Sequence, residues 1–231
     1  MAAAAIAAGL LLAAVPLLEN VLAPRAETDD PAASMAWIEQ AGLSYVWSGV
    51  ALMTAGPLLV VVALGVLRIL GGAAASLAVW SATVFALLSA GGYIVTGALR
   101  QNARGTLSYI AAMNPDWAES AYLVVHIAGT QALYVVGALG LAGWFVVIGI
   151  VGFRRGIRGM LALTVFPAIF LLGQLVTGIL PVVAADELGI SWFVHIAVLV
   201  VVLPASLIAV GCLLLRPGFT ARFEAGSASR G

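Results

Sequence analysis

The sequence predicts an all-α, polytopic transmembrane helix bundle of about six spans, and three observations lead to this prediction. Of its 231 residues, 63% are hydrophobic and only 9% are charged, whereas soluble domains carry about 25% charged residues. The charges cluster between long apolar stretches, as expected of a chain whose solvent is lipid. These stretches reach the length of about 20 residues that a helix needs to cross the hydrocarbon.

Six apolar segments reach this length. We expect spans near residues 3–22, 45–70, 72–99, 120–153, 160–183 and 191–215. The first segment resembles a secretory signal, but it lacks a positive n-region, and Pro24 spoils the cleavage point after Ala23, so we expect a retained span. The fourth is overlong and should tilt or project from the bilayer. Residues 1–216 are therefore predicted to form a single transmembrane domain, and 217–231 a short cytoplasmic tail.

The orientation follows from the arginines, because basic residues concentrate in cytoplasmic loops. With both termini inside, Arg25, Arg100 and Arg104 lie outside, and all the other basic residues lie inside. The inner set is Arg68, Arg154, Arg155, Arg158, Arg216, Arg222 and Arg230. We therefore expect a multi-pass protein of a bacterial-type cell membrane with the N-terminus and the C-terminus inside. The lipid bilayer is its first partner, and zero net charge gives no indication of a nucleic-acid partner.

Two Asx–Pro pairs in the outer loops predict helix starts. Asp30–Pro31 and Asn114–Pro115 each resemble an N-cap followed by proline at the first helical position. The first pair introduces residues 31–41, which carry Trp37 among apolar neighbours. We expect this segment to be a short helix in the outer interface.

The second half of the predicted bundle contains a repeated pattern. The third and fifth spans share GYIVTGAL from Gly92 and GQLVTGIL from Gly173, and the fourth and sixth share VHIA around His126 and His195. These are the only two histidines of the chain. Two interpretations stay open: a parallel repeat about an axis along the membrane normal, or coincidence in a chain dominated by small apolar residues.

The two histidines are the strongest candidate site, because ionisable residues within spans usually face the bundle interior. Neutral imidazole can bind a haem iron or a transition metal, so we name His126 and His195 as candidate metal ligands. The same histidines could instead only form hydrogen bonds in an outer vestibule. A third possibility adds Glu19 to give a site of two histidines and one carboxylate.

With these histidines and glycines, the last four spans resemble, in arrangement, the four-helix haem bundle of respiratory cytochrome b. The resemblance implies haem b as cofactor, His126 and His195 as axial ligands, and Gly92 and Gly173 as the glycines that make room for it. Arg100 and Arg104 lie just outside and could pair with the propionates. That family has two histidines on each ligand-bearing helix, whereas this chain has one on each, so it could hold one haem.

In length and span number the chain also resembles small six-helix bacterial membrane-protein families of unknown function. No phosphate loop, nucleophile elbow or HExxH motif is present in the sequence, which disfavours an enzyme. We therefore expect a non-enzymatic integral membrane protein that binds a cofactor or a lipid-like ligand from the outer side, with haem as the specific hypothesis. The alternatives are a cofactor-free carrier of a small or lipid-like molecule, or an accessory subunit that joins other membrane subunits or forms a homo-oligomer.

Overall fold

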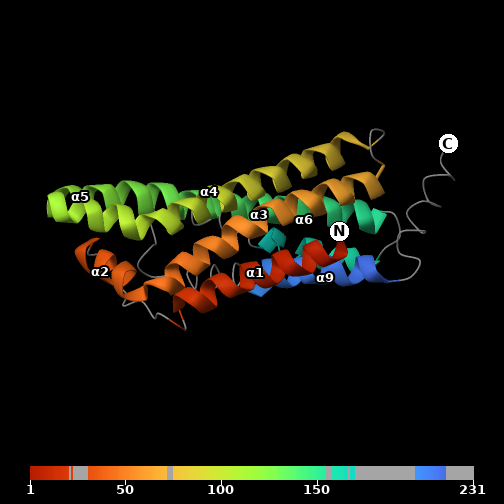
Figure 1. The fold of residues 1–231 in the computed structure, drawn as a ribbon. Helices are drawn as coiled ribbons and strands as arrows, with labels where there is room; N and C mark the ends of the chain where they lie inside the picture. The colour runs from red at the N-terminus through yellow and green to blue at the C-terminus, as the bar shows by residue number, and fades with distance from the viewer. Residues whose placement is uncertain are drawn as a thin grey trace.

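The fold was analysed in a computed structural model, which describes residues 1–20, 22, 31–71, 75–154, 158–165, 167–169 and 201–216. Within these residues the chain is helical and forms no strand (Figure 1). The helices are α1 (Ala2–Asn20), α2 (Pro31–Ala41), α3 (Leu43–Ile69), α4 (Leu77–Met113), α5 (Pro115–Tyr122), the π-helical η2 (Leu123–Gln131), α6 (Ala132–Arg154), the 3₁₀-helical η3 (Arg158–Leu161) and α9 (Leu203–Leu215). The predicted all-α class is confirmed.

Four of these helices, α1, α3, α4 and α6, are long and apolar enough to cross a membrane. This supports a multi-pass membrane protein and matches the first four predicted spans. The predicted spans at 160–183 and 191–215 lie largely outside the described residues. Their described part includes the 13-residue apolar helix α9. The count of six spans therefore stays a prediction.

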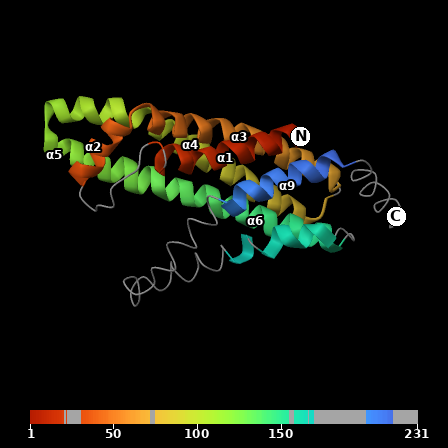
Figure 2. The ribbon, with the colours of Figure 1, turned by 90° about the horizontal axis from the view of Figure 1, so that it is seen from below.

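The long helices lie side by side along one direction (Figures 1 and 2). Helix α3 packs between α1 and α4, α4 packs on α6, and α1 packs on α9. The first residue, Met1, contacts Gly65 near the end of α3, so the start of α1 and the end of α3 share one end of the bundle. We call this the N-terminal end, and the opposite end, which carries α2 and α5, the α2 end.

Glycines bring the helix backbones into direct contact. A Cβ added at Gly49 of α3 would lie 2.7 Å from the carbonyl oxygen of Gly97 on α4, and one added at Gly92 would lie 2.8 Å from that of Leu133 on α6. Likewise, a Cβ at Gly9 of α1 would lie 2.8 Å from the carbonyl oxygen of Pro204 in α9. Small residues at such crossings are the usual means by which membrane helices associate, because they allow close van der Waals packing.

Helix α4 extends well beyond the predicted span. The prediction ended this span at residue 99, but the helix continues to Met113 and has 37 residues, which corresponds to about 55 Å. Trp80, which is 44% exposed near its start, precedes Arg100 by about 30 Å of helical rise, the thickness of the hydrocarbon. Residues after Arg100 therefore project about 20 Å beyond it, because arginines at the end of an apolar stretch do not stop a helix.

The projecting part of α4 is covered by α2 and α5. A separate hydrophobic cluster joins the three elements to the start of α3, and it consists of Ile38, Ala41, Tyr45, Ala103, Leu107 and Tyr122. The predicted N-cap is confirmed at Asn114, whose side chain accepts a hydrogen bond of 2.9 Å from the N–H of Asp116. The predicted helix over residues 31–41 is also confirmed, and it turns into α3 at Gly42.

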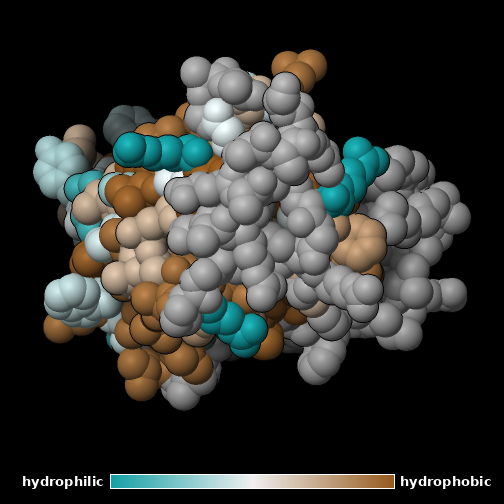
Figure 3. Space-filling model, turned by 90° about the vertical axis from the view of Figure 1, so that its right-hand side faces the viewer, coloured by the Kyte–Doolittle hydropathy of each residue, from teal (hydrophilic) through white to brown (hydrophobic). Residues whose placement is uncertain are grey.

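The N-terminal end of the bundle is largely apolar on its described surface, with separate hydrophilic residues (Figure 3). Three of the arginines that were predicted to lie inside, Arg68, Arg154 and Arg216, are exposed and lie at the ends of α3, α6 and α9. This arrangement agrees with the predicted orientation, which itself stays a prediction.

Candidate functional site

A buried ion pair lies at the α2 end of the bundle. Nη1 of Arg100, on α4, donates a hydrogen bond to Oε1 of Glu19, at the end of α1 and 81 residues away in sequence. The Arg100 side chain is 9% exposed and that of Glu19 is 19% exposed. Buried charges are costly unless they are paired, so each of these two groups depends on the other.

Ser48 connects this pair to α3. Its Oγ donates a hydrogen bond of 2.6 Å to Glu19 Oε1 and lies 3.5 Å from Arg100 Nη1, which can donate to it. The close crossing at Gly49 and Gly97 lies beside these groups, since a Cβ at Gly49 would meet Cβ of Arg100 at 3.1 Å. The crossing therefore holds Ser48 and Arg100 together, and we call Glu19, Ser48 and Arg100 the charge centre.

Two tyrosine rings flank the guanidinium group. Cζ of Arg100 lies 5.9 Å from the ring centroid of Tyr45 on α3 and 5.5 Å from that of Tyr134 on α6. Both distances are within the range of cation–π attraction, which strengthens when the cation is desolvated. Trp37 of α2 contacts Tyr45 edge to face, with centroids 5.6 Å apart. Two aromatic rings therefore lie against the charge centre, and Trp37 packs on one of them.

A polar stripe runs down α4 from the charge centre into the bundle. Ser89, Tyr93, Thr96 and Arg100 follow one another at spacings of four, three and four residues, which places them on one helix face. All four are buried. Nε of Arg100 and Oγ1 of Thr96 have no hydrogen-bond partner among the described residues. Both atoms can therefore still bond to a further polar group.

The structure gives the predicted haem residues different surroundings. Gly92 lies against the α6 backbone at Leu133 and Gly137, so its described role is helix packing. Arg100 pairs with Glu19, so a propionate would have to displace that carboxylate, whereas Arg104 is exposed beside α2. Of the described haem candidates, therefore, only Arg104 keeps an exposed position.

The predicted pairing of the histidines lies outside the described residues. The backbone of His126 lies in η2, while its side chain, His195 and Gly173 lie outside the described residues. Glu19 has Arg100 and Ser48 as partners. The described residues contain no group of three His, Cys, Asp or Glu side chains that could hold a metal ion. The bis-histidine site and the internal repeat stay predictions.

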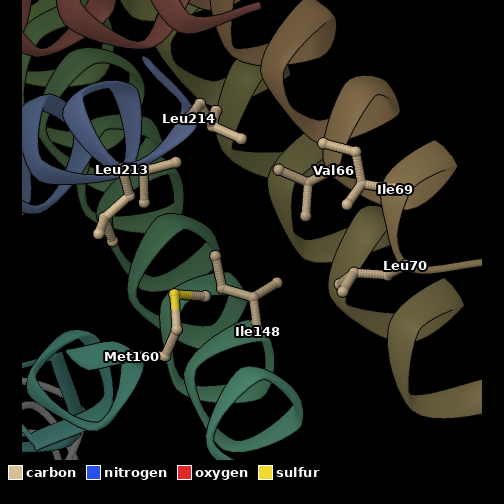
Figure 4. Close-up of a pocket in the computed structure, with 8 residues that line it drawn as sticks. Val66, Ile69, Leu70, Ile148, Met160, Leu213 and Leu214 are labelled. Atoms are coloured by element: carbon tan, nitrogen blue, oxygen red, sulfur yellow. The ribbon is translucent and has the colours of Figure 1, made fainter. Parts of the chain in front are cut away.

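A cavity at the N-terminal end offers no recognition chemistry. It has a volume of about 30 Å³, and its described lining comes from α3, η3, α6 and α9 (Figure 4). The lining residues are Val66, Ile69, Leu70, Ile148, Met160, Val210, Leu213 and Leu214. A cavity of this size that lacks polar partners is expected to stay dry. We therefore interpret it as a packing gap between helix ends.

Comparison of the chain with protein-family models, with curated proteins and with solved structures finds no match. The candidate site therefore rests on the geometry of the charge centre. Glu19 and Arg100 were each named from the sequence but were not paired. A signal was present: Glu19 lies near the outer end of one predicted span, and Arg100 directly follows the outer end of another.

Proposed function

We propose that this chain is a six-span protein, with both termini in the cytoplasm, that binds an acidic amphiphilic molecule from the outer side through Arg100. The observation that supports this function is the buried guanidinium group between two tyrosine rings, with its Nε unpaired. Glu19 engages Nη1 alone. An external carboxylate or phosphate could replace Glu19 and accept two parallel hydrogen bonds from Arg100. Such a bidentate pair is stronger than a contact through Nη1 alone.

The polar stripe supports binding rather than conduction. Ser89 lies 11 residues before Arg100, about 16 Å deeper and so near the middle of the hydrocarbon. Further toward the N-terminal end, the same face of α4 continues with the buried Ala86, Ala82 and Val79. The stripe therefore reaches from the charge centre to about the midplane and ends there. A pathway through the bilayer would need polar groups at every depth.

The proposal is tested with a fluorescent long-chain fatty acid and its uncharged methyl ester, each titrated onto the purified protein in nanodiscs. Glu19→Gln removes the competing carboxylate and keeps its size, so the acid should bind about tenfold more tightly, which corresponds to about 1.4 kcal/mol. The double variant Glu19→Gln/Arg100→Gln buries no charge at this site and should bind the acid at least tenfold more weakly than the single variant. Glu119→Gln is the matched control, because it removes a carboxylate from α5 at the same end.

Equal binding of the acid and the ester by the wild-type protein and the Glu19→Gln variant would overturn the proposal. The charge centre would then be an ion pair that only holds α1, α3 and α4 together. Thermal unfolding of each variant in the same nanodiscs separates loss of binding from loss of fold.

The haem hypothesis is a second candidate, and one observation favours it. His126 lies within η2, a nine-residue π-helical segment, and π-helical turns occur frequently at functional sites. If His126 and His195 hold haem, protein from haem-supplemented cells should show a low-spin Soret band. His126→Ala and His195→Ala should each abolish the band. A colourless wild-type protein, or an unchanged band in both variants, would eliminate this candidate.

A further inference from the structure

A pocket of about 220 Å³ separates α2 from the projecting part of α4. Its walls are mostly apolar, and one cation and one carboxylate also line it. The described lining residues are Ala32, Met35, Ala36, Ile38, Glu39, Arg104, Leu107 and Ala111. Ile38 and Leu107 belong to the buried cluster between α2, α4 and α5, so the base of the pocket is well packed.

The pocket lies at the depth of lipid headgroups. Arg104 follows Arg100 by four residues, so it lies about 6 Å beyond the edge of the hydrocarbon. The polar layer on each side of a bilayer is about 5–7 Å thick, which places Arg104 among the lipid phosphates. Trp47, which is 57% exposed near the level of Arg100, agrees with an interface at this height, because tryptophan concentrates at headgroup level.

One of the two charged residues of the pocket, Glu39, already has a hydrogen-bond partner. Oε1 of Glu39 accepts a hydrogen bond of 3.0 Å from Oγ of Ser108, one turn beyond Arg104 on α4. No salt bridge joins Glu39 to Arg104, and Arg104 makes no other salt bridge within the described part of the chain. The pocket therefore presents a positive and a negative group between apolar walls. A complementary ligand carries both charges and an apolar body.

We propose that this pocket binds the headgroup of an outer-leaflet phospholipid that carries a phosphate and a primary ammonium group, as in phosphatidylethanolamine. Arg104 binds the phosphate, because a guanidinium group pairs with phosphate oxygens through two parallel hydrogen bonds. Glu39 accepts hydrogen bonds from the ammonium group, which carries three donors. Met35 and Ala36 of α2 contact the glycerol backbone and the first acyl carbons.

The charge pattern distinguishes this ligand from the other common phospholipids. A phosphatidylglycerol headgroup has no cation for Glu39. The trimethylammonium group of phosphatidylcholine carries a charge but no N–H donor for the carboxylate. This inference does not rest on the function proposed for Arg100, since Glu39 and Arg104 are exposed and lie outside the charge centre.

The experiment uses native mass spectrometry of the full-length protein, delipidated in mild detergent. The protein is titrated with phosphatidylethanolamine, phosphatidylglycerol and phosphatidylcholine of identical acyl chains, and separately with soluble phosphoethanolamine. We expect at least tenfold tighter binding of phosphatidylethanolamine than of the other two lipids. Phosphoethanolamine alone should bind much more weakly, because it lacks the apolar part. Equally tight binding of phosphoethanolamine would mean that a free headgroup compound, and not the lipid, is the ligand, and would overturn the proposal.

Two variants test the two contacts separately. Arg104→Gln should weaken all three phospholipids about tenfold, whereas Glu39→Gln should remove the preference for the ethanolamine headgroup. Both residues are exposed, so melting temperatures should be unchanged. Arg68→Gln and Glu119→Gln are the matched controls. The proposal fails if the wild-type protein binds the three lipids equally, or if both pocket variants keep the preference. The Glu19→Gln/Arg100→Gln variant should keep it, so failure of the two proposals can be told apart.

Discussion

Replacing Gly97 by alanine should force α3 and α4 apart at the crossing beside the charge centre. The new Cβ would lie 2.6 Å from the backbone nitrogen of Met53 and in still closer contact with the carbonyl oxygen of Gly49. Real Cβ atoms essentially never approach other atoms within 3.0 Å. Backbone atoms cannot rotate away as a flexible side chain can, so the helices themselves must separate. The 3.5 Å contact between Arg100 and Ser48 should lengthen with them.

The magnitude follows from comparison with Gly91 on the same helix, where an added Cβ meets nothing within 4 Å. Both substitutions gain the higher helix propensity of alanine, which is worth up to about 1 kcal/mol. Only Gly97→Ala also suffers overpacking, which costs about 1–3 kcal/mol. The propensity gain cancels between the two variants. Gly97→Ala should therefore be less stable than Gly91→Ala by about 1–3 kcal/mol.

The assay is reversible unfolding of the purified protein in mixed micelles of increasing denaturing detergent, followed by circular dichroism. Gly49→Ala tests the same crossing from α3, where the added Cβ would lie 2.7 Å from the Gly97 carbonyl oxygen. The double variant Gly49→Ala/Gly97→Ala should lose less stability than the sum of the single variants, because one separation of the helices relieves both clashes. Equal stabilities of Gly91→Ala and Gly97→Ala would refute the crossing as described.

Three further predictions concern topology and turns. In a Cys212→Ala background, Gly105→Cys should react with an impermeant thiol reagent added to intact cells, whereas Arg154→Cys should react only after lysis. Labelling of Arg154→Cys in intact cells would refute the predicted orientation, in which both termini lie inside. Asn114→Ala should destabilise α5 by about 1 kcal/mol, which should be seen as faster amide hydrogen exchange in α5 and not in α3. An unchanged exchange rate would show that the Asn114 cap does not stabilise α5. Gly42 has a φ of 51° and a ψ of −115°, a backbone conformation that residues with a Cβ rarely adopt. Gly42→Ala should therefore lower the stability by about 1–3 kcal/mol through backbone strain. An unchanged melting temperature would contradict this prediction.

Local signals in the sequence predicted the elements well. Apolar length predicted α1 and α3 nearly to their ends, and the Asx–Pro pairs predicted the starts of α2 and α5. These features depend on neighbouring residues alone: an apolar run has to cross lipid, and proline after an N-cap residue favours a helix start. The end of α4 was missed because hydropathy reports where a helix leaves the lipid, while the helix itself continues to Met113.

The charge centre could not be derived in the same way. Glu19 and Arg100 are 81 residues apart, and their meeting depends on which helices are neighbours, which no local pattern reveals. The role of Gly92 also depends on which helices are neighbours, so the sequence alone could not decide it. Its position at a predicted helix interface was compatible with room for a cofactor and equally with a close helix crossing. The described structure shows the crossing with α6 at Gly137 and Leu133.

The length of α4 has a mechanical consequence. A continuous helix is stiff over this distance, so the part outside the hydrocarbon must move together with the part inside. Arg100 lies near the boundary, about 20 Å from Met113 at one end and about 35 Å from Leu77 at the other. With Arg100 as the pivot, a tilt of about 10° would displace Met113 by about 3 Å and Leu77 by about 6 Å in the opposite direction. A tilt of α4 would therefore couple the α2 end of the bundle to its N-terminal end, with the pivot beside Glu19.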